Sequence, residues 1–220
     1  IRRQRQMCIR DRDTTVSVAV KLRDEADAYA VFWTTTPWTV PTNFAIVVGA
    51  DIDYVEVRPT EGKFAGKKFY IGKPLLGSYT KELGENYEVV RELKGAEMAG
   101  WRYYPVFPYF ASDSALAEGG TPGPNAFTIF TADYVDTAEG TGLVHQAPYG
   151  EDDMNTLNAH EIRSVDVLDA GCKFTSDCPD YEGLYVFDAN LPILRNLRAG
   201  DGPLAQMPDC LLYTSDAADE

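Results

Sequence analysis

The chain has 220 residues and a formal charge of −14 at pH 7, because 34 Asp and Glu outnumber 20 Lys and Arg. Its hydrophobic content of 45% is that of an ordinary globular protein and argues against a disordered chain. A chain this acidic lacks the broad basic surface that binds long nucleic acids, so any RNA would be contacted at a small end. No apolar run approaches the roughly 20 residues of a membrane span, and no secretory signal is visible. We expect no membrane partner and a cytoplasmic location.

The two ends differ in character from the rest. Residues 1–12 hold five arginines without a hydrophobic period, and residues 209–220 are equally atypical. Both resemble translated sequencing-adapter sequence, so we expect them to be non-native and place one domain at residues 13–208. The functional alternative for residues 1–12 is a basic arm that binds nucleic acid.

The expected elements are short and mostly strands. Apolar residues alternate with polar ones in the first strand, and later apolar runs are rich in β-branched and aromatic residues. The pattern predicts strands at 15–22, 30–33, 44–48, 54–58, 67–71, 87–93, 126–130 and 143–147, short strands within 174–187, and helices at 75–83, 154–162 and 191–198. Regular β-α alternation is missing. We therefore predict an α+β fold with a mixed or barrel-like sheet and a few peripheral helices.

One polar segment interrupts these strands early in the chain. Residues 33–43 read WTTTPWTVPTN and lie between two apolar runs. Pro37 and Pro41 fix φ and lack an N–H, so we expect a stiff loop between two buried strands. The hydroxyls of its threonines suit a neutral ligand with many oxygens, such as a ribose. The alternative is that threonine is simply a good strand residue and the prolines mark a turn.

A second segment carries ionisable groups. Residues 140–153 read GTGLVHQAPYGEDD, in which His145 lies near the end of a strand and Asp152 and Asp153 follow it. Taken alone, the histidine is an ordinary core residue and the aspartates are ordinary caps of a helix N-terminus. The four cysteines form no C-x-x-C and only two histidines are present, so we expect no metal site.

Together the two segments, about a hundred residues apart, resemble the editing domain of isoleucyl-tRNA synthetases. The likeness extends over roughly residues 13–205 and is strongest to the eukaryotic-type cytosolic form, through VHQAPY and the intervening YPVFPYF. Related valyl and leucyl domains share the first two threonines but continue with arginine where this chain has Thr36.

The resemblance implies the β-rich fold of editing domains inserted into class I aminoacyl-tRNA synthetases. It also implies hydrolysis of valine wrongly esterified to the 3′ end of isoleucine tRNA. One methylene gives only about 1–3 kcal/mol of discrimination, a figure for which these synthetases are themselves the standard example. A second, smaller pocket therefore removes the error.

The resemblance also implies roles for individual residues. Asp153 would hold the α-ammonium of the amino acid by a charge-assisted bond. Thr35 and Thr36, with Asn43, would hold the ribose and orient water or the oxyanion. The side-chain pocket would be lined by Trp38, Thr39 and His145.

Further expectations follow for partners and cofactors. The partner would be the 3′ end of tRNA(Ile) carrying valine, and editing would need no cofactor or metal. ATP and Mg²⁺ would serve a catalytic domain that acts in cis and whose His-x-Gly-His and Lys-Met-Ser-Lys-Ser signatures this chain lacks. We expect a fragment without aminoacylation activity, and a monomer.

The chain departs from the family pattern near Asp153. Only Tyr149 separates Ala-Pro from Gly, where two residues are usual, and Met154 replaces a tyrosine. A one-residue deletion could shift a carboxylate by up to about 3.5 Å. The rival interpretation is therefore a non-catalytic domain that binds an aminoacyl-adenosine or is inert, and a third is an unrelated ligand-binding domain.

Overall fold

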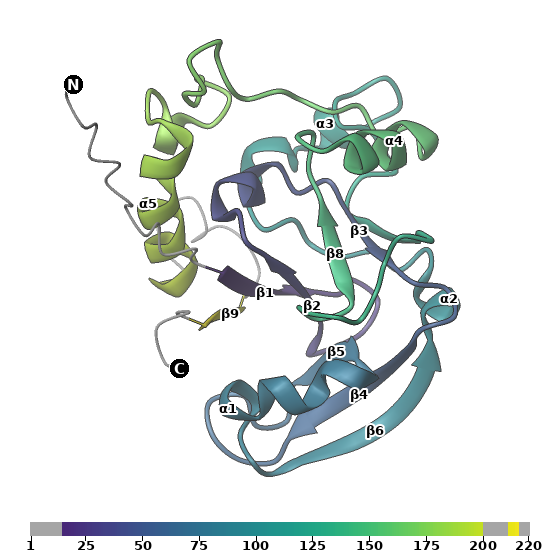
Figure 1. Cartoon of the computed structure of the whole chain (residues 1–220). Helices are drawn as coiled ribbons and strands as arrows, with labels where there is room; N and C mark the ends of the chain where they lie inside the picture. The colour runs from purple at the N-terminus through teal and green to yellow at the C-terminus, as the bar shows by residue number, and fades with distance from the viewer. Residues whose placement is uncertain (1–14, 200–210, 216–220) are drawn as a thin grey trace, which may run out of the picture.

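The computed structural model describes residues 15–199 and 211–215. Within them, nine strands form one mixed sheet with short helices around it (Figure 1). The strands are β1 Thr15–Lys21, β2 Ala28–Thr34, β3 Ala45–Val48, β4 Asp53–Pro59, β5 Lys68–Gly72, β6 Tyr87–Lys94, β7 Thr128–Thr131, β8 Leu143–Gln146 and β9 Leu211–Ser215. The α-helices are α1 Thr80–Leu83, α2 Gly95–Met98, α3 Asp113–Leu116, α4 Glu151–Ala159 and α5 Val186–Ala199. The 3₁₀ helices are η1 Pro37–Thr42, η2 Lys73–Tyr79, η3 Pro108–Phe110 and η4 Pro179–Tyr181.

The sheet branches at β2. The strand order is β6-β4-β5-β2-β8-β3-β7, and β1 pairs with β2 outside this path. Residues 28–30 of β2 pair in parallel with β5, whereas Trp33 pairs with Val144 of β8. The end of β2 therefore lies beside β8, and the threonine segment that follows it starts next to the segment that carries His145.

Period-two alternation divides the core between the two faces of β2. Ala28, Ala30 and Phe32 belong to one buried cluster, and Tyr29 and Val31 belong to the other. This is the geometry of a strand buried on both faces, where successive side chains point in opposite directions. The predicted α+β class, with a mixed or barrel-like sheet and a few helices, is confirmed.

The segment after β2 is more regular than the stiff loop that we predicted. It forms the 3₁₀ helix η1, in which the Thr39 N–H bonds to the Thr36 carbonyl at 3.0 Å. Pro37 stands in the first turn, where its missing N–H costs nothing, and its fixed φ favours a helical start. Pro37 thus starts a tight helix, and Pro41 lies inside it.

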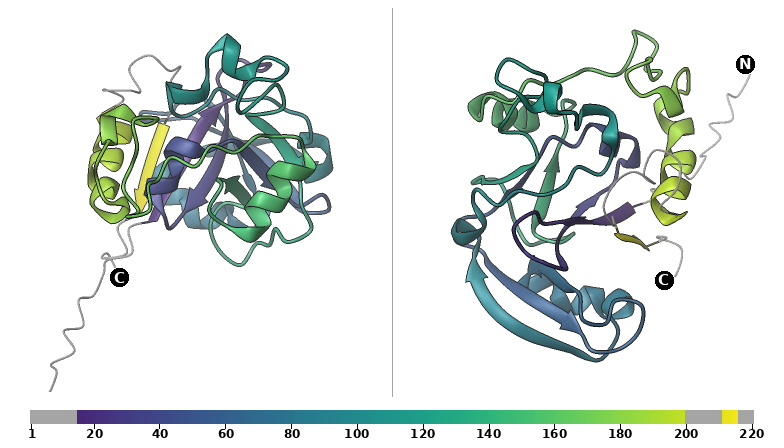
Figure 2. Two further views of the ribbon diagram at one scale, coloured as in Figure 1. Left: turned by 90° about the horizontal axis from the view of Figure 1, so that it is seen from above. Right: turned by 180° about the vertical axis from the view of Figure 1, so that it is seen from behind.

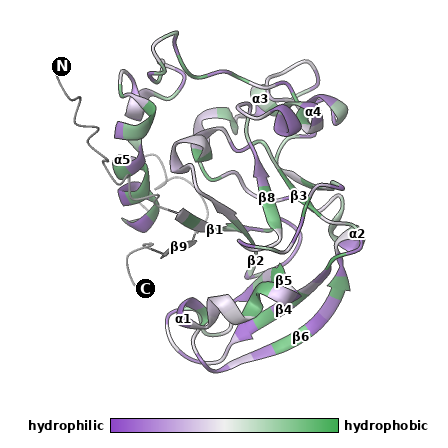
Figure 3. Cartoon of the chain, viewed as in Figure 1, coloured by the Kyte–Doolittle hydropathy of each residue, from purple (hydrophilic) through white to green (hydrophobic). Residues whose placement is uncertain are grey.

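Two helices begin earlier than predicted. Helix α4 begins at Glu151, so three acidic residues lie in its first turn. Helix α5 begins at Val186 and contains Pro192, and its residues alternate between hydrophobic and hydrophilic (Figure 3). The short strands predicted within residues 174–187 are absent from the described chain; isolated bridges and η4 occupy that segment.

The described ends of the chain lie close together. Strand β9 pairs antiparallel with β1, and both lie beside α5 (Figure 2). Strand β9 falls within residues 209–220, the segment expected to be non-native, and that expectation stays a prediction. Residues 1–12 lie outside the described residues.

Candidate functional site

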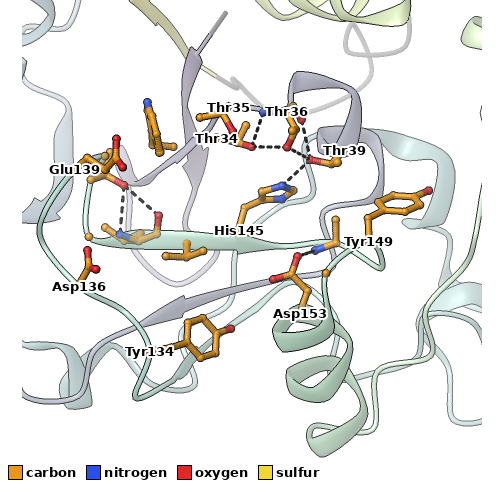
Figure 4. Close-up of a pocket in the computed structure, with 18 of the residues that line it drawn as sticks. Thr34, Thr35, Thr36, Thr39, Tyr134, Asp136, Glu139, His145, Tyr149 and Asp153 are labelled. Carbon is orange, nitrogen blue, oxygen red and sulfur yellow. Dashed lines mark hydrogen bonds between the residues drawn. The ribbon is translucent and has the colours of Figure 1, made fainter. Parts of the chain in front are cut away.

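A cavity of about 500 Å³ opens where β2, η1, β8 and the start of α4 meet (Figure 4). It brings together the two segments that the sequence singled out. The lining residues are Trp33, Thr34, Thr35, Thr36, Trp38, Thr39, Tyr134, Asp136, Glu139, Gly140, Thr141, Gly142, Leu143, Val144, His145, Ala147, Tyr149, Gly150 and Asp153. Six of the seven residues expected at the site are among them; Asn43 is not.

The threonine hydroxyls form a connected row on the η1 side of the cavity. The hydroxyl of Thr36 lies 3.1 Å from that of Thr34 and 3.3 Å from that of Thr39. Thr34 also accepts the N–H of Thr36 at 3.1 Å, and Thr39 donates to the carbonyl of Thr36 at 2.8 Å. The row is held by its own chain, so its oxygens are positioned before any ligand arrives.

His145 is buried, and both its ring nitrogens are occupied. Its Nε2 lies 2.8 Å from the Thr39 hydroxyl, and its Nδ1 lies 3.2 Å from Nδ2 of Asn43. Asn43 Nδ2 also donates to the Ala45 carbonyl at 3.1 Å. Because a carbonyl only accepts, this bond fixes the amide orientation, so Asn43 donates to Nδ1 and the proton of the ring is on Nε2.

The direction of the hydrogen bonds can therefore be followed across the site. Tyr103 donates to Asn43 Oδ1 at 2.7 Å, and burial raises the pKa of the Tyr103 hydroxyl well above its ordinary value. Asn43 donates to His145, and His145 donates through Nε2 to Thr39. Asn43 thus lies behind the histidine and is not among the residues that line the cavity, and the ribose contact that the resemblance implied for it stays a prediction.

Burial keeps His145 neutral. Desolvation lowers the pKa of its imidazole to about 4. The ring stacks on Phe32 with centroids 5.2 Å apart. With Nδ1 accepting and Nε2 donating, the side chain forms a fixed neutral wall, and it has no free nitrogen to take a proton.

Asp153 reaches the cavity from the first turn of α4. Its Oδ2 accepts the N–H of Ala147 at 3.3 Å, which ties the helix to the end of β8. Burial raises the pKa of its carboxyl, the Ala147 N–H opposes this, and the neighbouring Asp152 adds to it. The short connection through Tyr149 and Gly150 therefore leaves Asp153 on the cavity wall.

Helix α5 supports η1 from behind. Trp38 carries the first N–H of η1, since Pro37 has none, and this N–H donates to Oδ1 of Asn190 at 2.9 Å. The N-cap residue Thr36 makes no side-chain cap bond. Trp38 also packs against Tyr149, with ring centroids 4.8 Å apart. Because Asn190 of α5 caps η1, the Thr36 hydroxyl is not needed as a cap and bonds within the threonine row instead.

Sequence reasoning missed the opposite wall. Tyr134, Asp136 and Glu139 lie there in the loop between β7 and β8 (Figure 4). Tyr134 donates to Gln146 Oε1 at 2.7 Å. The only signal was their place just before the Gly-Thr-Gly turn, because the loop has no periodicity.

The described residues offer no group of three or more His, Cys, Asp or Glu that could hold a metal ion. They also include no helix long and apolar enough to cross a membrane.

Comparison with known proteins places this geometry in a family. The isoleucine–tRNA ligase of Bifidobacterium longum is 83% identical over 197 residues, which are 90% of this chain and 18% of that protein. The isoleucine–tRNA ligase of Corynebacterium diphtheriae is 46% identical over 176 residues, or 78% of this chain and 16% of that protein. The chain is homologous to one segment of the isoleucine–tRNA ligases. It spans less than a fifth of the length of these relatives.

Solved structures identify the fold of this ligase segment. The crystal structure of GlLeuRS-CP1 matches with a TM-score of 0.60 at 11% identity, over 91% of this chain and 99% of that one. The editing domain of the P. falciparum cytosolic leucyl-tRNA synthetase matches with a TM-score of 0.58 at 10% identity, over 92% and 99%. The predicted editing-domain fold is confirmed. No family model matches the chain.

The predicted resemblance to isoleucyl-tRNA synthetases is likewise confirmed. Its finer part, the eukaryotic-type form, stays a prediction; the two ligases compared above are bacterial.

Proposed function

We propose that the segment hydrolyses the ester of valine wrongly attached to isoleucine tRNA. One observation carries this: a single cavity in a homologue of isoleucine–tRNA ligases joins the threonine row, His145 and Asp153. An aminoacyl ester presents an ammonium, a carbonyl, a branched apolar side chain and a ribose. The cavity offers a carboxylate, neutral hydroxyls and an aromatic wall for these groups.

The ammonium would pair with Asp153. The carboxylate stands at the N-terminus of α4 and already accepts one N–H, so it is directed and partly desolvated. A charge-assisted bond to an ammonium is stronger in such surroundings than in water. It would hold the ester in one orientation for attack.

The amino-acid side chain would contact Trp38, Thr39 and His145. The imidazole is held on both nitrogens and by Phe32, so it cannot move aside cheaply. This rigidity suits a pocket that accepts valine and excludes the additional methylene of isoleucine. Thr35 and Thr36 would bind the ribose and orient water.

The attacking water would be activated by the tRNA. Water adds to the ester carbonyl, the bond from carbonyl carbon to ribose oxygen breaks, and that oxygen leaves with a proton while valine leaves as the acid. His145 has no free nitrogen to act as a base. The adjacent free hydroxyl of the terminal ribose would relay the proton, without a metal or a covalent intermediate. A tRNA that lacks this hydroxyl should be hydrolysed far more slowly.

The remaining expectations belong to the same proposal. The 3′ end of isoleucine tRNA is the partner, and other ligase domains in cis supply tight binding, ATP and Mg²⁺ chemistry. The segment itself is a cytoplasmic monomer without aminoacylation activity. The competing function is binding of an aminoacylated adenosine without hydrolysis.

Deacylation of valyl-tRNA(Ile), with isoleucyl-tRNA(Ile) as the control ester, tests this function. Asp153→Asn should reduce the rate at least about a hundredfold, the cost of losing a positioning contact. Asp152→Asn, its exposed neighbour on α4, is the matched control and should stay within a few-fold of the wild type. A folded wild-type chain that binds the ester but leaves it intact would favour the competing function.

A further inference from the structure

Helix α4 carries Asp153 into the cavity, yet few polar contacts hold its first turn. The N-cap residue Gly150 provides no side-chain cap. Among the described residues, the Asp153 side chain has one hydrogen bond, from the Ala147 N–H at 3.3 Å, which is longer than the usual N–H···O bond. A carboxylate that must meet an ammonium needs a helix that is held more closely than this.

A second tie between α4 and the sheet passes through Tyr134. This residue lies in the loop between β7 and β8, and its hydroxyl points toward α4 (Figure 4). The hydroxyl lies 2.7 Å from Oε1 of Gln146 in β8 and 3.1 Å from the Thr156 hydroxyl in α4. Thr156 stands three residues after Asp153, so the two side chains share one face of the helix. Tyr134 therefore bonds both to the strand that carries His145 and to the helix that carries Asp153.

The positions of the hydrogens in this tie follow from Gln146. Its Nε2 donates to the His145 carbonyl at 3.2 Å, so its Oε1 faces Tyr134 and can only accept. The Tyr134 hydroxyl gives its one proton to this oxygen, so the Thr156 hydroxyl donates to Tyr134. Burial raises the pKa of the Tyr134 hydroxyl, the bond from Thr156 opposes this, and the charge of Asp153 adds to the rise. The phenol therefore keeps the proton that the tie requires.

The core does not account for a tyrosine at this position. Tyr134 is 42% exposed, whereas Gln146, to which it bonds, is fully buried. A phenylalanine would occupy the same space, so the contribution that only tyrosine makes is the bridging hydroxyl.

We propose that Tyr134 is a positioning residue, which sets the distance between Asp153 and β8 through Thr156. This role rests on the proposed function, in which Asp153 pairs with the ammonium of the amino acid. Without the bond to Thr156, the first turns of α4 are free to move away from β8. A shift of about 1 Å at such a contact can cost about a hundredfold in rate. Because the effect passes through the carboxylate, it should concern the ammonium alone.

Two non-hydrolysable mimics separate this role from a merely structural one. The first, 3′-valylamido-3′-deoxyadenosine, carries the ammonium, and its 3′-isovalerylamido analogue lacks it. We expect the wild-type chain to bind the first about tenfold or more tightly, which is the contribution of a hydrogen bond between charged groups. Thr156→Val replaces the hydroxyl of the tie by a methyl group and should reduce this preference about threefold or more, with the affinity for the analogue unchanged. Thr156→Ser keeps a hydroxyl and should retain the preference.

Tyr134→Phe tests the other end of the tie. It should reduce the preference as much as Thr156→Val does, and the double variant should be no worse than either, since both remove the same bond. Tyr134→Phe also leaves the buried Oε1 of Gln146 without a donor, so urea denaturation must first show that the variant is folded. Thr80→Val on α1 and Tyr185→Phe are the matched controls at exposed positions and should behave like the wild type.

The outcomes separate this role from the proposed function. If the wild type prefers the ammonium and neither Thr156→Val nor Tyr134→Phe changes that preference, the positioning role is refuted and the proposed function stands. Equal weakening of both mimics would also refute the role, because the change would then concern the cavity as a whole. If the folded wild-type chain binds neither mimic, or binds both equally, the proposed function fails and the positioning role fails with it.

Discussion

Asn43→Leu should destabilise the protein strongly, because the Asn43 side chain is buried and its polar atoms bond only to buried partners. Leucine is close to asparagine in shape, but it cannot bond to Tyr103, His145 or the Ala45 carbonyl, which lie 2.7, 3.2 and 3.1 Å from the amide. A buried polar group that loses its partner costs about 1–3 kcal/mol. Three such groups lead us to expect a loss of about 3 kcal/mol or more in the free energy of unfolding.

Urea denaturation measures this loss, provided that the slope with denaturant stays unchanged. Asn125→Leu is the matched control, since its side chain is exposed and makes one bond, to the His160 carbonyl. We expect that variant to lie within about 0.5 kcal/mol of the wild type.

A double-mutant cycle tests the reasoning further. Tyr103→Phe alone leaves Asn43 Oδ1 unpaired and should cost about 1–3 kcal/mol. In the Asn43→Leu background the Tyr103 hydroxyl is already unpaired, so the same change should be neutral or stabilising. Equal costs in both backgrounds, or an Asn43→Leu variant as stable as the Asn125 control, would refute the buried hydrogen-bond network described above. Imidazole ¹⁵N shifts test the direction of the bonds, and we expect the His145 proton on Nε2 in the wild type.

Three further changes have defined outcomes. The pKa of His145 is about 4 in the folded protein, below the ordinary histidine value of 6.5. Between these two pH values the unfolded chain binds a proton at this residue and the native chain does not. Stability should therefore decline by about 3 kcal/mol between pH 6.5 and 4; a His145→Gln variant with the same decline in urea titrations at each pH would contradict this. Asn190→Leu should lower the free energy of unfolding by about 1 kcal/mol, because η1 loses the cap on its Trp38 N–H. Asn190→Asp keeps an acceptor oxygen and should retain the stability. Asn196→Leu on the same helix is the control and should have little effect in thermal unfolding. Gly140→Ala should cost about 1–2 kcal/mol, because φ is +76° and the new Cβ meets Trp33 at 3.0 Å. An unchanged urea midpoint for Gly140→Ala would show that the backbone and Trp33 accommodate the added methyl group at no cost, and would contradict this prediction.

The strands could be predicted from local pattern, and part of the site from a family resemblance. Alternation in β1 and the apolar run of β2 are strand patterns, and the structure has a strand at each place, although β1 is buried on both of its faces. The threonine segment and the His145 segment were paired through their joint resemblance to a family, not through local pattern, and the structure places them in one cavity.

Other features could not be predicted because they depend on partners distant in the chain. Asn43 is in the threonine motif, yet Tyr103, 60 residues away, helps to place it behind His145. Asn190 caps η1 across 152 residues of sequence. Neither residue carries a local signal of these contacts.

The sequence by itself determined the fold class, the positions of strands β1 to β8 and the chemical character of one cavity wall, but not β9. The tertiary structure decided which hydroxyls and nitrogens bond to one another, and it added the opposite wall with Glu139. The physical reason is that side-chain periodicity depends on near neighbours, whereas the hydrogen-bond partners come from segments that the pairing of β8 with β2 and β3 brings together. That pairing joins segments about a hundred residues apart in the chain.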